Sequence, residues 1–134
     1  MSHEDTTKEI IRLFYHTYNQ LGYGFLEKVY ENALSIELAA NSFTVKRQEP
    51  ILVYYKGEQV GDYIGDIIVN DLILLELKSV EDIIQAHRNQ TINYLKATKI
   101  EVALLLNFGE KPKFERFIFM NNRKTLLNNF LKSV

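Results

Sequence analysis

Three charged residues stand out in a largely apolar stretch that reads GDYIGDIIVNDLILLELKSV, from Gly61 to Val80. Asp66 lies in its first half, and Glu76 and Lys78 lie in its second half. Side chains alternate along a strand, so Glu76 and Lys78 share a face. A carboxylate on a buried strand requires a compensating charge or hydrogen bonds. Two hypotheses meet that requirement: an ion pair of either acid with Lys78, or two acids that hold a divalent metal while the lysine stabilises a phosphate.

The pair Asn70-Asp71 in the middle of this stretch predicts a β-hairpin, because both residues tolerate left-handed backbone angles. With a strict two-residue loop, Asp66 would oppose Leu75, and Glu76 would lie on the other face. A three-residue loop, or a bulge in either strand, shifts the pairing by one residue and sets Asp66 opposite Glu76. The metal hypothesis therefore requires an irregular hairpin, and bulges are over-represented next to active sites.

The composition restricts the kinds of site that the chain can build. It contains no cysteine, which excludes disulfides and thiolate metal sites, and its three histidines, His3, His16 and His87, are too scattered to suggest zinc. Oxygen ligands remain, and these favour Mg²⁺ or Mn²⁺. A formal net charge of −1 and a pI near 6.3 give no overall basic surface. Any contact with nucleic acid must therefore be local.

We expect a single domain over residues 1–134, because the length and a hydrophobic content of 46% suit one core. No run approaches the roughly 18 uninterrupted apolar residues of a membrane helix. The first residues, MSHEDTTKEI, also lack the apolar core of a secretory signal. The expectation is a cytoplasmic protein without a membrane partner.

Periodicity predicts the elements that must position the charged residues. Apolar residues at helical spacing predict a helix from Thr6 to Asn19 and a longer one from Leu26 to Ala40, separated by the glycines of LGYGF. Alternating and β-branched residues predict a strand from Phe43 to Tyr55. Pro50 favours a place for this strand at a sheet edge, or a break within it.

The elements after the hairpin complete an α/β pattern. Ser79, with an acid three residues later, predicts the N-cap of a helix that runs to about Thr98. The apolar run from Glu101 to Phe108 predicts a buried strand, which the intervening helix allows to lie parallel to the hairpin. A strand from Phe114 to Met120 and a helix from Arg123 to Leu131 should follow. The predicted fold class is α/β, with a mixed central sheet flanked by helices.

Two helices carry further candidates. Glu27 lies in the first turn of the second helix, where a carboxylate also favours the positive end of the helix dipole. Gln90 and Tyr94 are four residues apart and share a face of the helix after the hairpin, as an ordinary half-buried pair would. Neither observation identifies a site alone.

In combination, these residues resemble the PD-(D/E)XK nuclease superfamily. Asp66, then Glu76-Leu77-Lys78, then the QxxxY pattern of Gln90 and Tyr94 follow the order found in its RecB-like and phage-exonuclease branches. The stretch Gly24 to Tyr30, GFLEKVY, is similar to the pattern that names the GxxExxY proteins. The resemblance covers about residues 5 to 120. One departure is that glycine, not proline, precedes Asp66.

The resemblance implies a restriction-endonuclease-like αβββαβ core and assigns roles to its residues. Asp66, Glu76 and the Leu77 carbonyl would ligate Mg²⁺ or Mn²⁺, and Glu27 would complete the ligand set. Lys78 would orient the attacking water or neutralise charge at the phosphate. Lining and supporting roles would fall to the remaining candidates, Gln90, Tyr94 and Tyr30.

The function that follows is a metal-dependent nuclease with DNA as the expected substrate. The carboxylates of Glu27, Asp66 and Glu76 and the amine of Lys78 should then converge on one pocket. Two alternatives remain open: a non-catalytic nucleic-acid-binding or protein-interaction module that keeps the fold, and a toxin–antitoxin-like partner. A homo-oligomer is also left open.

Overall fold

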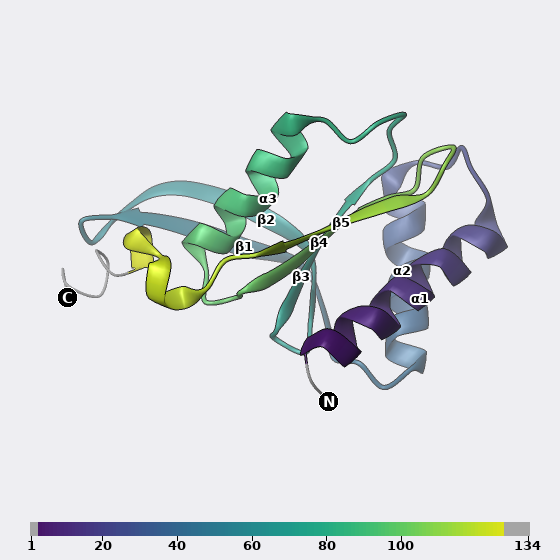
Figure 1. Cartoon of the computed structure of the whole chain (residues 1–134), viewed down its shortest axis with the longest axis horizontal. Coiled ribbons are helices and arrows are strands. Elements are labelled where there is room, and N and C mark those ends of the chain that lie inside the picture. Colours follow the sequence, from purple (N-terminus) through teal and green to yellow (C-terminus); the bar gives the residue numbers. More distant parts are fainter. Residues whose placement is uncertain (1–2, 128–134) are drawn as a thin grey trace.

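The computed structural model describes residues 3–127, which form helices on both sides of a β-sheet (Figure 1). Its elements, in chain order, are α1 His3–Leu21, α2 Glu27–Ala40, β1 Val45–Tyr55, β2 Glu58–Val69, β3 Ile73–Lys78, α3 Gln85–Ala97, β4 Val102–Asn107, β5 Lys113–Ile118 and the 3₁₀ helix η1 Asn121–Arg123. From α2 to β4 this is the predicted αβββαβ order.

The sheet is mixed, as predicted. Its strands lie in the order β1-β2-β3-β4-β5. The β3–β4 pair is parallel, because α3 carries the chain back between them, and the other neighbouring pairs are antiparallel. Strand β1 lies at an edge, which agrees with the position of Pro50.

Two apolar cores lie on opposite faces of the sheet (Figure 1). On the first face, α1 and α2 pack against residues such as Ile67, Leu75 and Leu104, all of which are fully buried. On the second face, α3 packs through Tyr94 and Leu95. Side chains of β3 therefore alternate between the two cores, and the even-numbered residues face α3.

The hairpin of β2 and β3 has the irregular form that the metal hypothesis requires. Val69 pairs with Ile73, so the loop contains three residues, and the register sets Asp66 opposite Glu76. Asn70 and Asp71 have φ angles of 54° and 55°, a left-handed conformation that short polar side chains tolerate. The Asn70 side chain also accepts a hydrogen bond from the Thr44 N–H, at 2.8 Å. The prediction of an irregular hairpin is confirmed.

Part of the way along β1 and β2, the side chains that faced α1 and α2 turn to the opposite side of the sheet, toward α3. Val45 packs on the side of α1 and α2, whereas Ile51 belongs to the core under α3, although a regular strand would turn both residues to one side. The change occurs at Gln48, which has a φ of 52° and lies opposite Asp66 in the register. Beyond it, residues 49–65 form a two-stranded arm that is rolled toward α3 (Figure 1).

The helix predicted from Ser79 begins at Gln85 instead, so Ser79 is not its N-cap. The side chain of Asn107 binds both backbone groups of Val80, at 3.0 and 3.1 Å, and the Ser79 hydroxyl donates to the Phe25 carbonyl at 3.0 Å. These bonds extend the chain past β3 and occupy the hydroxyl that a cap would use. At the observed start, His87 Nδ1 accepts a hydrogen bond from the Ile84 N–H.

The remaining predicted elements agree with the structure within a few residues at their ends. Of the closing helix predicted over Arg123 to Leu131, only its first residues lie within the described part, and there η1 and a helical turn at residues 125–127 occur. The rest of that prediction lies outside the described residues. Among the helices of residues 3–127, none combines the length and apolarity that a bilayer crossing requires.

Gly109 provides a test of the junction between β3 and β4. A Cβ atom at this position would collide with the backbone carbonyl oxygen of Val80, which cannot move without breaking its bond to Asn107. We expect Gly109→Ala to lower the free energy of unfolding by about 2 kcal/mol or more in urea denaturation. Gly61→Ala is the control, because its Cβ would meet only side-chain atoms, at 3.1 to 3.3 Å. Equal losses in the two variants would contradict the assignment.

Candidate active site

Asp66 and Glu76 lie side by side on the face of the sheet that α3 covers. Glu76 is 4% exposed, and one of its carboxylate oxygens accepts a hydrogen bond from the Asp66 N–H at 3.2 Å. In return, an oxygen of Asp66 accepts a hydrogen bond from the Leu77 N–H at 2.8 Å. The two acids are therefore held by the backbone of each other's strand, as the three-residue loop requires.

The electrostatics of this acid pair are those of a site short of positive charge. Burial, with a further contribution from the charge of Asp66, raises the pKa of Glu76 to about 8. Burial also raises the pKa of Asp66, against the opposing effect of the Leu77 N–H. Near neutral pH the pair therefore retains a proton, chiefly on Glu76. A divalent cation could replace that proton, and a donor set of carboxylate oxygens fits Mg²⁺ or Mn²⁺.

Lys78 lies on the same face as Glu76, two residues further along β3. Its ammonium group opposes the rise in pKa of both acids of the pair, and it does the same for Glu27. With Glu76 protonated, Lys78 balances the charge of Asp66 alone, and one lysine would leave a net negative charge if both acids were ionised. Lys78 thus belongs to the site, but it does not neutralise two ionised acids.

Glu27 begins α2, and its carboxylate interacts electrostatically with Lys78 and Asp66. Although Glu27 is exposed, partial burial raises its pKa; the charge of Lys78 acts to lower this pKa, and the charge of Asp66 acts to raise it. Within residues 3–127, however, no group of three or more histidine, aspartate or glutamate side chains is spaced to hold a metal ion. Its role as a metal ligand stays a prediction.

Tyr30 lies away from the charges and shapes the loop that precedes Glu27. Its hydroxyl donates to the Gly22 carbonyl at 2.6 Å and accepts a hydrogen bond from the Phe25 N–H at 3.2 Å. Its buried ring stacks on Phe108, with centroids 4.4 Å apart. The spacing of glutamate and tyrosine in GFLEKVY therefore has a local structural reason: Tyr30 holds the loop that leads into Glu27.

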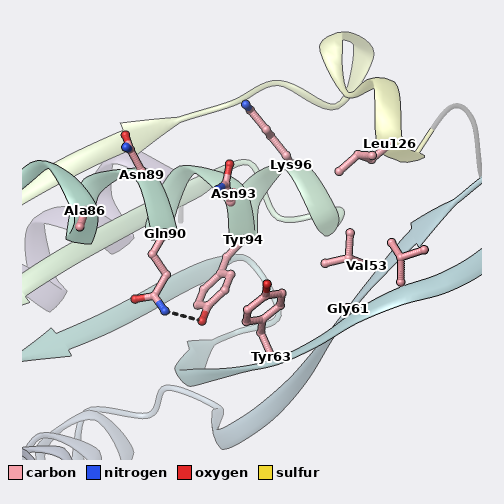
Figure 2. Close-up of a pocket in the computed structure, with 11 residues that line it drawn as sticks. Val53, Gly61, Tyr63, Ala86, Asn89, Gln90, Asn93, Tyr94, Lys96 and Leu126 are labelled. Carbon is pink, nitrogen blue, oxygen red and sulfur yellow. Dashed lines mark hydrogen bonds between the residues drawn. The ribbon is translucent and has the colours of Figure 1, made fainter.

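Gln90 and Tyr94 approach the acid pair from α3, and Figure 2 shows their side chains together. Gln90 donates to the Tyr94 hydroxyl at 2.9 Å, and Tyr94 is 5% exposed. Burial raises the pKa of Tyr94, and the next contribution is the charge of Glu76. Both residues also line a cavity of about 580 Å³ between α3 and the arm. The pair therefore connects the acids to this cavity.

Glu31 is a buried charge that the sequence reasoning missed. Arg47 and Gln48 donate to its two carboxylate oxygens, each at 2.6 Å, and Lys28 adds a bond at 3.1 Å. Burial acts to raise the pKa of Glu31, but these bonds outweigh it and the net shift is downward. Since Glu31 lies one helical turn after Glu27, its position could have signalled it. It anchors β1 at the point where the strand changes faces.

His87 lies near Lys78, a position that the sequence reasoning did not predict because it considered the histidines only as zinc ligands. Burial lowers the pKa of His87, and the next contribution comes from Lys78. With Nδ1 accepting from the Ile84 N–H, the neutral ring carries its proton on Nε2. Its place three residues before Gln90, on the same face of α3, was the available signal.

Comparison with known proteins supports the nuclease-like fold. A family model described as the PD-(D/E)XK nuclease superfamily matches residues 4–117. A solved structure, titled "Crystal structure of SSO0001", superposes with a TM-score of 0.57 at 15% sequence identity. The match covers 80% of this chain and 57% of that chain, and at this identity it shows the fold alone. None of the curated proteins matches the sequence. The GxxExxY branch stays a prediction.

The raised pKa of Glu76 predicts how the stability of the metal-free protein depends on pH. Between the ordinary pKa of 4.5 and the folded value of about 8, the folded protein binds more protons than the unfolded chain. Its free energy of unfolding in EDTA should therefore decrease as pH rises through this window. Glu76→Gln should flatten the decrease, whereas Glu58→Gln, at the exposed start of β2, should leave it unchanged. Urea denaturation at pH 5 and pH 8 would measure both slopes, and identical slopes in wild type and Glu76→Gln would contradict the assignment.

The hydroxyl of Tyr30 can be tested separately from its ring. Tyr30→Phe keeps the stacking on Phe108 but leaves the Gly22 carbonyl and the Phe25 N–H without this partner. We expect a loss of about 1–3 kcal/mol in the free energy of unfolding. Tyr18→Phe removes a similar bond at the surface, to the Glu110 carbonyl, and should change stability by about 0.5 kcal/mol or less. If Tyr30→Phe were as stable as the wild type, the hydroxyl would not secure the loop.

Proposed function

The chain belongs to the PD-(D/E)XK nuclease superfamily, and on this premise we propose that it is a divalent-metal-dependent nuclease that hydrolyses phosphodiester bonds. DNA is the substrate that the resemblance implies. The observation that carries the proposal is the convergence of Asp66, Glu76 and Lys78 on one face of the sheet. Apolar residues of similar size often stabilise a protein as well as buried charged groups do, so stability alone does not account for this acid pair.

The residues that would hold the metal are Asp66, Glu76 and the carbonyl of Leu77, with Glu27 as a further expected ligand. When bound, the ion would lower the pKa of a water molecule and polarise a phosphoryl oxygen. The Leu77 N–H fixes the rotation of the Asp66 carboxylate before any ion binds. The chain thus supplies oxygen donors that are already in place, which reduces the cost of assembling them.

Lys78 would act on the phosphate. Its positive charge lies on the face of the acid pair, where negative charge develops as the phosphodiester bond breaks, and such preorganised charge lowers the barrier to reaction. Gln90 and Tyr94 would position the substrate strand from the side of α3, since Tyr94 lies near the acid pair and Gln90 donates a hydrogen bond to its hydroxyl. These roles differ in kind, because loss of charge should affect the chemical step and loss of positioning should affect substrate use more mildly.

Cleavage of DNA tests the proposal directly. Purified protein should cleave linear or branched DNA with Mg²⁺ or Mn²⁺ and should be inactive in EDTA. Lys78→Ala should lower turnover by roughly 10²-fold or more while it retains the rise in melting temperature that Mn²⁺ causes. Glu76→Gln should lose both cleavage and most of that rise.

Lys46→Ala is the matched control, because Lys46 is a partly exposed lysine on the same sheet. Its ammonium group forms an ion pair, at 2.7 Å, with Asp71 of the hairpin loop. It should keep wild-type cleavage. If Lys78→Ala kept full activity, or if no single-stranded, duplex, branched or RNA substrate were cut, the nuclease assignment would fail. A non-catalytic nucleic-acid-binding or protein-interaction module would then be the better description.

A further inference from the structure

The cavity between α3 and the arm is separate from the acid pair but opens beside it. Its volume is about 580 Å³, and its walls include Val53 and Tyr63 from the arm and Gln90, Asn93 and Tyr94 from α3 (Figure 2). Tyr94 links the cavity to the acid pair, because its ring lines the cavity and its hydroxyl interacts electrostatically with Glu76. A group held in the cavity would therefore be a near neighbour of a phosphate held at the acids.

Tyr63 gives the cavity an aromatic wall. Its ring is 49% exposed, and its centroid lies 5.6 Å from that of the buried Tyr94, at an angle of 48°. In Figure 2 the two rings and the Gln90 amide point toward one another. An exposed tyrosine ring supported from one side by a second ring offers a flat surface for stacking.

The other residues that line the cavity suit a nucleobase better than a phosphate group. Its amide side chains are Asn89, Gln90 and Asn93, and Lys96 is the charged residue among the described residues that line it. Within the described part of the chain, no carboxylate that would repel nucleic acid lines the cavity. Amides read the edges of bases, aromatic rings stack on their faces, and a phosphate pocket would instead need several cations.

We propose that this cavity binds an unpaired nucleobase of the substrate strand, stacked on Tyr63, next to the phosphate at the acid pair. The inference rests on the proposed function and adds a substrate class to it. A base inside a duplex has both faces covered by its neighbours, so it cannot enter a cavity between a helix and a strand pair without leaving the stack. The preferred substrate is therefore single-stranded at the point of cleavage, as in a free strand, an overhang or a flap.

The face change of β1 and β2 at Gln48 and Asp66 explains why the cavity lies there. Because the arm is rolled toward α3 from this point, Val53, Gly61 and Tyr63 face the helix instead of the side of α1 and α2. The three-residue loop places Asp66 beside Glu76, and the face change at Gln48 then brings Tyr63 close to Tyr94. Catalytic acid and stacking ring are three residues apart on one strand, a separation suited to adjacent parts of one nucleotide chain.

Binding of labelled DNA in EDTA, where no strand is hydrolysed, tests the cavity without reference to activity. The probes are fluorescein-labelled oligonucleotides of one sequence, as a single strand, as a blunt duplex and as a duplex with an overhang. We expect the single strand and the overhang to bind more tightly than the blunt duplex in fluorescence anisotropy. Tyr63→Leu, which keeps an apolar contact with Tyr94 but removes the ring, should weaken single-strand binding about tenfold or more.

Two variants separate stacking from other effects. Tyr63→Phe keeps the ring and should bind the single strand within about twofold of wild type. Tyr55→Leu is the matched control, because Tyr55 is 50% exposed on the same arm but does not line the cavity, and it should also bind within about twofold. Wild-type affinity in Tyr63→Leu, an equal loss in Tyr55→Leu, or equal affinity for single strand and blunt duplex would each overturn the inference. Absence of any single-strand binding would overturn it as well.

The outcome can be distinguished from failure of the proposed function. If the protein binds single strands through Tyr63 but cuts none of them with Mg²⁺ or Mn²⁺, the base site stands and the nuclease assignment falls. If it cuts DNA and Tyr63→Leu changes neither affinity nor preference for single strands, the nuclease assignment stands and the base site falls.

Discussion

The register between β2 and β3 is the constraint on which this site depends. Side chains alternate with a period of two, so a slip of one residue would send Asp66 to the face opposite Glu76. Two buried carboxylates repel each other and would favour such a slip, but the loop opposes it. Asn70 is bonded to Thr44 through both its backbone and its side chain, and it adopts the left-handed angle that the three-residue loop needs. A turn at one end of the hairpin thus fixes the chemistry at the other end.

The surrounding structure stabilises this arrangement from several directions, and it does so with polar rather than apolar contacts. Glu31, Arg47 and Gln48 hold the strand beside Asp66, while Tyr30 secures the loop before Glu27. The Glu31 carboxylate and the Tyr30 hydroxyl both have hydrogen-bonding partners, as buried polar groups require. The acid pair itself carries an energetic cost, since burial disfavours the ionised form of both acids and Glu76 keeps a proton near neutral pH. Native proteins retain such local cost where function needs it.

Much of the fold followed from the sequence because its signals are local. The helical periodicity of Ile10 to Tyr18 and the apolar run of β4 each indicated an element within a few residues. Asp66, Glu76 and Lys78 were recognisable because charge in an apolar strand is unusual. What the sequence could not show depends on distant partners. Ser79 looked like a helix cap, but Asn107, from another strand, holds the chain extended there. Tyr63 gave no signal, because its importance arises from a change of face set by one left-handed residue in the neighbouring strand.

The left-handed backbone at Gln48 also affects association between copies of the protein through the edge strand β1. Strand β1 is an edge strand, and a regular edge offers a row of free N–H and C=O groups to which another chain can add by β-augmentation. Here the left-handed Gln48 bends that row, and Pro50, which has no N–H, interrupts it two residues later. The backbone feature that shapes the site therefore also protects the sheet against edge-to-edge aggregation.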